Sequence, residues 1–286
     1  MKRSDWLYDG QVARFRSLSG PLPDRRELFM HFGHWDEAPP ATPDLQAFLA
    51  AQERLDAHLR ALAELPAGAH VLDAGCGLGG TVAALLDEAA PARAVGLNID
   101  PRLVAIAERL VVASPGCTPE WVVGDACALP FPAGSFDAIF AVECAPHFGS
   151  RAAFFAEAAR ALRPGGRVVL SDFVPTAALR AARDGGALPA GFEEAVARDL
   201  APWSDFFGDG PDDIALGRAA GLAIECEIDA TAETLPTYDV LIPGPPRALI
   251  AAPGAPPDPA RGMTALSWAQ GRGLLCMRYY AFSRPR

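Results

Sequence analysis

The sequence has little of what secreted, membrane-spanning or nucleic-acid-binding proteins depend on. None of its six cysteines forms a Cys-x-x-Cys pair, which indicates reduced, buried thiols of a cytosolic protein. No apolar run approaches the roughly 20 residues of a membrane-spanning helix, and the charged start, Met1–Gly10, does not have the pattern of a signal peptide. Basic residues are outnumbered, 25 Lys and Arg against 35 Asp and Glu, and the resulting charge of −10 disfavours nucleic acid or anionic membranes as partners. These absences predict a cytoplasmic globular protein.

A regular alternation of strands and helices begins at residue 70. A length of 286 residues corresponds to one large domain or two small ones, and a chain of this size, half of it hydrophobic, buries a sizeable core. Strand patterns alternating with helices of about a dozen residues imply parallel pairing through right-handed crossovers. The fold class predicted is therefore α/β, with a doubly wound, mostly parallel sheet. The expected strands cover 70–73, 94–97, 121–123, 136–142 and 166–170, and the helices between them cover 78–89, 101–112 and 151–162.

Segments outside this alternation divide the chain into a lid and a core. Residues 1–65 combine an aromatic leader with an amphipathic helix that ends before Pro66, and we predict an N-terminal helical lid there. The predicted core, 66–286, contains an insertion at about 174–213 placed to cover a ligand cavity. Proline and glycine predict a loop over 243–262. Residues 222–228 and 274–282 have the pattern of the last two strands.

The most informative stretch is Val71–Gly80, which reads Val-Leu-Asp-Ala-Gly-Cys-Gly-Leu-Gly-Gly. Its glycines match the dinucleotide-binding pattern G-x-G-x-x-G, which leaves an NAD(P)-dependent oxidoreductase as one alternative. Asp73 argues against that alternative, because its carboxylate would face a pyrophosphate that needs backbone N–H groups. The same carboxylate suits a ligand with an ammonium group, such as S-adenosylmethionine (SAM). A buried acid without a partner is costly, so a ligand role is favoured.

Asp73–Gly79 resembles the first motif of class I SAM-dependent methyltransferases of the small-molecule, natural-product type. Four later segments resemble that family's following motifs in order, and the resemblance covers roughly residues 66–175. It implies a seven-stranded Rossmann-like sheet whose sixth and seventh strands are the last two of this chain. One departure is Asn98, which stands where most members place an acid on the ribose, so either Asn98 or Asp100 would hold it. The four segments are Gly96–Pro101, Val123–Ala126, Phe136–Phe140 and Leu162–Gly166.

The resemblance implies SAM as cofactor and S-adenosylhomocysteine as product. Asp125 would bind the adenine amino group, with capping of a loop as its structural alternative, and helix capping is the alternative for Asp100. The cofactor-binding residues expected from the motifs are Asp73, Gly75, Gly77, Asn98, Ile99, Asp125, Ala126 and Glu143.

Two residues after the fourth strand are candidates for catalysis, because family members bring SAM and acceptor together there. His147 is the candidate general base, since imidazole titrates nearest neutral pH; a histidine bonded to backbone at a helix start is the alternative. Glu143 would orient His147, hold a cationic substrate or only lend its backbone to SAM. Asp172, at the end of the fifth strand, is a further candidate for an orienting role.

The acceptor is expected beneath the lid. The leader Phe29–Asp36 is similar to aromatic leaders that close over SAM and acceptor in small-molecule methyltransferases, and packing is the alternative role for its aromatic residues. His31 and His34 are three residues apart with no third ligand evident, so no metal site is predicted. The candidate acceptor-binding residues are Tyr8, His31, Trp35, His147, Trp203 and Phe206.

Together these features predict methyl transfer from SAM to a small, fairly hydrophobic secondary metabolite, with O-methylation slightly favoured over C- or N-methylation. The expected partner is a small-molecule acceptor, without nucleic acid or membrane, and the protein is expected to be a monomer or homodimer. A non-methylating cyclase or SAM-binding regulator on the same scaffold remains an alternative.

Overall fold

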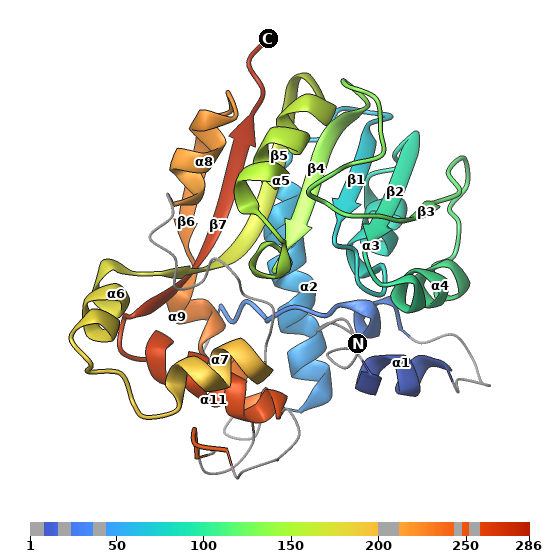
Figure 1. The fold of residues 1–286 in the computed structure, drawn as a ribbon. Coiled ribbons are helices and arrows are strands. Elements are labelled where there is room, and N and C mark those ends of the chain that lie inside the picture. Colours follow the sequence, from blue (N-terminus) through green and yellow to red (C-terminus); the bar gives the residue numbers. More distant parts are fainter. Residues whose placement is uncertain (1–8, 17–23, 37–43, 200–211, 243–247, 252–257) are drawn as a thin grey trace.

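The computed structural model describes residues 9–16, 24–36, 44–199, 212–242, 248–251 and 258–286. Its centre is one seven-stranded sheet with the order β3-β2-β1-β4-β5-β7-β6 (Figure 1). The first five strands in the chain are parallel, and β7 is antiparallel to both of its neighbours. The predicted doubly wound, mostly parallel sheet is therefore confirmed. The strands are β1 (His70–Ala74), β2 (Arg93–Asn98), β3 (Glu120–Val123), β4 (Phe136–Val142), β5 (Leu162–Pro175), β6 (Ala223–Asp229) and β7 (Leu275–Ser283).

Helices cover both faces of the sheet. The buried apolar residues form two clusters, one on each face of the sheet. In β1, Val71 belongs to the cluster that includes residues of α2, α3 and α4, and the next residue, Leu72, belongs to the cluster that includes residues of α5. Among the described residues, no helix is both long and apolar enough to cross a membrane. The helices are α1 (Asp9–Arg16), α2 (Leu45–Leu62), α3 (Gly80–Glu88), α4 (Pro101–Leu110), α5 (Arg151–Ala161), α6 (Ala177–Asp184), α7 (Phe192–Asp199), α8 (Asp213–Ala219), α9 (Thr231–Thr234), α10 (Thr237–Leu241) and α11 (Pro259–Gln270), with short 3-10 turns η1 (Arg25–Leu28) and η2 (Ala145–His147).

Local sequence signals fix where the core helices begin. The carboxylate of Asp100 accepts the N–H of Arg102, and Pro101 occupies the first position of α4, which needs no donor. Asp44 caps α2 and Ser150 caps α5 in the same way. These caps satisfy N–H groups that a helix leaves without partners, so the helix starts could be read from the sequence.

Two expectations about the second half of the chain were wrong. The loop expected over 243–262 ends earlier, because α11 begins at Pro259 with Asp258 as its N-cap. Strand β5 is 14 residues long, from Leu162 to Pro175, whereas 166–170 was expected. Near the start of β5 the register with β4 shifts, an irregularity within the longer strand. In the region of α11, proline and glycine were given too much weight as breakers of regular structure.

The leader segment, residues 29–36, crosses the carboxyl ends of the strands. Figure 1 shows it in blue, running below the strands from the neighbourhood of η1 toward α9. Phe29 packs against Gly80 at the start of α3, and the Phe32 ring lies 5.1 Å from that of Phe173 in β5. Further along, the N–H of Gly33 donates to the hydroxyl of Thr237 in α10. The leader is thus held over the edge of the sheet at which ligands of α/β folds bind.

Candidate cofactor and acceptor site

The residues expected to bind the cofactor come from four adjacent strands. Asp73 lies in β1, Asn98 ends β2, Asp125 follows β3 and Glu143 follows β4. Because β3, β2, β1 and β4 are neighbours and parallel, their carboxyl ends meet at one edge of the sheet (Figure 1). The structure therefore brings these four positions to a common edge although they span 70 residues of sequence.

Asp73 is buried, 3% exposed, near the end of β1. Among the described residues, no side chain or backbone group donates a hydrogen bond to its carboxylate. Burial, with the negative charge of Asp56 as a smaller cause, raises the pKa of Asp73 to about 8. The protein thus holds a carboxyl group whose ionised form lacks compensation, which a cationic ligand group would supply.

The glycine loop after β1 is shaped by contacts from other parts of the chain. Gly75 has a φ of +114°, and a Cβ there would lie 2.6 Å from the sulfur of Cys144. Gly77 has a φ of +52°, and a Cβ there would lie 2.8 Å from the sulfur of Met30 in the leader. Only glycine satisfies both the backbone conformation and the space at these positions. The leader and the loop after β4 therefore close directly on the glycine loop.

The two candidates for the ribose have different roles. Asp100 caps α4 and forms an ion pair with Arg102 at 2.7 Å, so the helix-cap alternative is confirmed. Asn98 is 8% exposed, and its side-chain oxygen accepts the N–H of Asp100 at 2.9 Å. With its oxygen engaged in this bond, Asn98 still has its side-chain N–H groups, which can donate to a ribose hydroxyl.

Two large apolar side chains are exposed beside these positions. Ile99 is 64% exposed and Val123 is 54% exposed, whereas most large apolar side chains of the sheet are buried. Asp125 is exposed, and one of its oxygens accepts the N–H of Cys127 at 2.8 Å, which is the loop-capping contact. Ala126 is buried. An apolar surface next to a carboxylate oxygen suits a flat heterocycle with an exocyclic amino group.

Glu143 connects the loop after β4 to the leader. Its φ of +48° is in the left-handed region, which is strained for a residue with a side chain. Both oxygens accept the backbone N–H of Phe32, at 3.0 and 3.1 Å. Burial nevertheless raises the pKa of Glu143 to about 8. Glu143 therefore fastens the leader across the site, a contact that the sequence did not indicate.

His147 ends the short turn η2, and its backbone N–H donates to the carbonyl of Cys144. Burial lowers the pKa of His147 from 6.5 to about 4, so its imidazole is neutral at physiological pH. Asp172 does not orient the His147 ring, because the Asp172 carboxylate pairs with Arg151 at 2.8 Å inside the core.

The candidate acceptor-binding residues are only partly described. Tyr8, Trp203 and Phe206 lie outside the described residues. Trp35 is buried and its indole N–H donates to Thr237 at 3.0 Å, so its polar group is already engaged within the fold. The Nδ1 atom of His31 bonds the carbonyl of Phe32 at 2.7 Å, and its buried Nε2 atom has no hydrogen-bond partner among the described residues.

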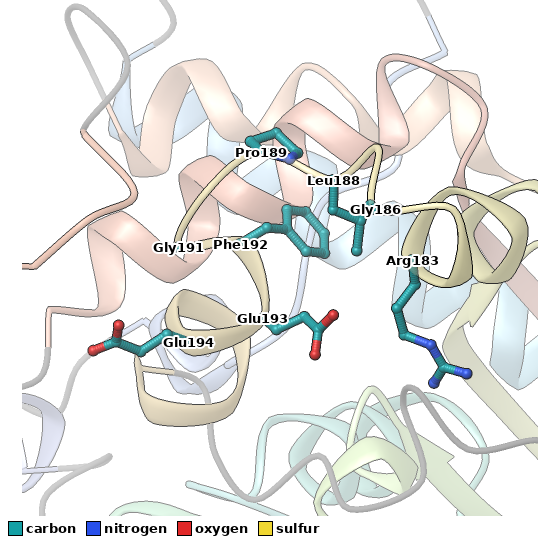
Figure 2. Close-up of a pocket in the computed structure, with 8 residues that line it drawn as sticks. All are labelled: Arg183, Gly186, Leu188, Pro189, Gly191, Phe192, Glu193 and Glu194. Atoms are coloured by element: carbon teal, nitrogen blue, oxygen red, sulfur yellow. The ribbon is translucent and has the colours of Figure 1, made fainter.

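A hollow of about 330 Å³ lies in the insertion between α6 and α7. Figure 2 shows Leu188 and the ring of Phe192 above, and the charged ends of Arg183 and Glu193 below them. Phe192 also packs on Trp268 of α11, with ring centroids 5.6 Å apart. The insertion thus forms a concave surface with an apolar and a charged side.

Asp56 in α2 was missed by sequence reasoning. It is fully buried, accepts the hydroxyl of Thr81 at 2.7 Å and pairs with Arg60 at 2.6 Å. Its charge raises the pKa of Asp73. The four-residue spacing of Asp56 and Arg60 on the helix was the one available signal.

Residues 72–170 match the family model described as a methyltransferase domain. The chain is 36% identical over 144 residues to 2-methyl-6-phytyl-1,4-hydroquinone methyltransferase of Synechocystis sp., covering 50% of this chain and 44% of that protein. It is 34% identical over 146 residues to 27-O-demethylrifamycin SV methyltransferase of Amycolatopsis mediterranei, covering 51% of each. The chain thus spans about half the length of these relatives.

Among solved structures, a geranyl diphosphate methyltransferase in complex with GPP and sinefungin matches with a TM-score of 0.67 and 18% identity, over 97% of this chain and 98% of that one. This likeness of fold covers nearly the whole chain and so extends beyond the matched domain. The chain carries a methyltransferase domain within a class I methyltransferase fold, and the resemblance found in the sequence is confirmed.

Proposed function

We propose that this protein transfers a methyl group from SAM to a small, fairly hydrophobic acceptor. The observation that carries the proposal is Asp73, a buried carboxyl group without a hydrogen-bond partner among the described residues, next to two glycines in the left-handed region. SAM carries an ammonium group that matches this carboxylate. The two relatives from Synechocystis and Amycolatopsis are both named as methyltransferases of small molecules.

The arrangement of the remaining groups fits the rest of SAM. Asn98 offers amide donors at the ribose position, and Ile99 with Val123 offers an apolar surface for adenine, with the exposed carboxylate of Asp125 nearby in the chain. When bound, SAM supplies a methyl group on a positively charged sulfur, which an acceptor atom displaces in line. The protein's main contribution to such a reaction is to position the two reactants and exclude water.

The leader is proposed to act as the lid. It contacts the glycine loop through Met30, and its Phe32 bonds Glu143 in the loop after β4, so it covers the site. We propose that the acceptor lies between this leader and the insertion, whose hollow has both apolar and charged walls (Figure 2). An oxygen acceptor is favoured slightly over carbon or nitrogen, since His147 offers a neutral imidazole to receive a hydroxyl proton.

Ligand-induced stabilisation tests the cofactor directly. With SAM or S-adenosylhomocysteine at about 100 times the Kd, the free energy of unfolding should increase by roughly 2.7 kcal/mol, a shift of several degrees in Tm. NADH at the same concentration should have no effect. A response to NADH alone, or to none of the three, would contradict the assignment of the glycine loop.

The role of His147 is tested by separating turnover from binding. With an oxygen acceptor, His147→Ala should lower kcat by about 100-fold, since general bases contribute roughly 10²–10⁴, and leave the Kd for SAM unchanged in calorimetry. Because burial lowers the pKa of His147 to about 4, the wild-type kcat at saturating SAM and acceptor should decline only as the pH falls toward that value, with no inflection near 6.5. An equal loss of turnover and SAM affinity would make His147 a structural or cofactor-binding residue.

A further inference from the structure

A cluster of three potential metal ligands lies where the leader meets α2. His34 and Asp36 come from the leader and His58 from α2, and one nitrogen or oxygen atom of each lies within 4.8 Å of the others. The imidazole rings of His34 and His58 are 4.3 Å apart. The sequence had offered only His31 and His34 as a histidine pair, because His58 lies 24 residues beyond His34 and joins it only through the fold.

The distances in the cluster are compatible with coordination. The Nε2 atom of His34 is 3.4 Å from Oδ1 of Asp36. Two ligands at 2.0–2.1 Å from a tetrahedral zinc ion lie about 3.4 Å from each other. Asp36 and His58 are exposed, so the His58 ring can turn toward the other two ligands at little cost and an ion has access from solvent.

His34 is also oriented as a metal-binding histidine usually is. Its backbone is held on both sides: the N–H of His34 donates to the carbonyl of Ala51, and its carbonyl accepts from Nε of Arg54. Its Nδ1 atom is 3.2 Å from the hydroxyl of the buried Tyr279 in β7. A proton on Nδ1, donated to this hydroxyl, leaves the Nε2 lone pair directed at Asp36 and available to an ion.

The neighbouring charges are mixed. The Nε atom of Arg54 lies 3.3 Å from Oδ2 of Asp36, so it holds the oxygen that is not needed for coordination. The negative charge of Glu233 in α9 also acts on His34 and raises its pKa. Arg54 opposes a cation and Glu233 favours one, so the two histidine nitrogens must supply most of the affinity.

We propose that His34, Asp36 and His58 form a binding site for a divalent transition-metal ion of the zinc class, which fastens the leader to α2. Two imidazoles and one carboxylate favour Zn²⁺, Co²⁺ or Ni²⁺ over Mg²⁺ or Ca²⁺, which prefer oxygen ligands. The site lies on the leader two residues after Phe32, whose N–H binds Glu143. A bound ion would hold the leader in the conformation that makes this contact.

The test uses the full-length protein without a histidine tag, freed of metal by a chelator and dialysed. Titration with Co²⁺ should produce visible absorption that saturates at one ion per chain and is displaced by Zn²⁺, while Mg²⁺ in excess should not compete. His58→Gln and Asp36→Asn should each weaken Co²⁺ binding at least about tenfold, the size of effect expected even for outer-shell changes. Both positions are exposed, so the variants should fold, and circular dichroism checks this.

His70→Gln is the matched control, because His70 begins β1 and binds Arg163 outside the cluster. It should bind Co²⁺ as the wild type does. Zinc should raise the Tm of the wild type and of this control but not of the two cluster variants. Absence of stoichiometric cobalt binding by the wild type, or binding unchanged in both cluster variants, would overturn the proposal.

Discussion

Asp73→Asn is expected to weaken SAM binding strongly while the protein stays folded. The substitution keeps the size of the side chain and removes the charge that would pair with the SAM ammonium group. Loss of one partner of a buried charge pair costs about 2–5 kcal/mol, which corresponds to a Kd increase of at least about 30-fold. Isothermal titration calorimetry with SAM and S-adenosylhomocysteine measures it.

The same substitution should stabilise the unliganded protein at high pH. The folded-state pKa of Asp73, about 8, is above its ordinary value of 3.8, so the folded state holds a proton that the unfolded state releases. The contribution of Asp73 to stability is therefore lost as the pH rises toward 8. Thermal unfolding should show Asp73→Asn more stable than the wild type at pH 8, with the difference shrinking toward pH 5.

Asp137→Asn serves as the control for this experiment. Asp137 lies near the start of β4, at the opposite end of the sheet, where it pairs with Arg163 at 2.6 Å. The Asp137→Asn variant should bind SAM with the same affinity as the wild type. If Asp73→Asn also retained wild-type affinity, the cofactor site would have to lie elsewhere and the proposed function would lose its main support.

Arg151→Met is expected to cause the largest loss of stability. Arg151 begins α5 and lies 2.8 Å from Asp172 of β5 and 3.7 Å from Asp213 of α8. Both carboxylates are essentially inaccessible to solvent. Removing the cation leaves two buried acids without compensation, which costs about 3–5 kcal/mol. Urea unfolding should show this as a lower midpoint with an unchanged slope.

This deficit should depend on pH in a defined direction. Burial raises the pKa of Asp172 and Asp213, and the charge of Arg151 opposes that rise. Without Arg151 both acids keep their protons to higher pH, so the variant loses stability as the pH rises and the acids must ionise. The difference from the wild type should be larger at pH 8 than at pH 5.

Two further variants separate this effect from a general loss of packing. Replacing Asp172 and Asp213 by Asn in the Arg151→Met background should recover most of the lost stability. Arg14→Met removes a surface ion pair with Glu27 and should cost less than about 1 kcal/mol. A pH-independent deficit that the added Asn residues do not reduce would show that Arg151 acts through packing alone.

The core of the fold could be predicted because its signals are local. Asp100 as a cap and Pro101 at the first helical position marked the start of α4, and short apolar runs between the helices indicated the strands. Prediction failed where local signals were ambiguous: Pro259 was taken as part of a loop, yet it begins α11 because Asp258 precedes it as a cap.

The α/β class, the order of the elements and the position of Asp73 beside the glycine loop could all be predicted from the sequence, since each follows from signals local to single helices, strands or loops. The tertiary structure was needed to show which distant groups meet. The bond from Phe32 to Glu143 joins residues 111 apart in the chain, and Arg151 meets Asp172 only because α5 packs on β5. The cluster of His34, Asp36 and His58 likewise requires the leader to lie against α2. Such contacts arise from the packing of whole elements, and neither periodicity nor spacing in the sequence records them.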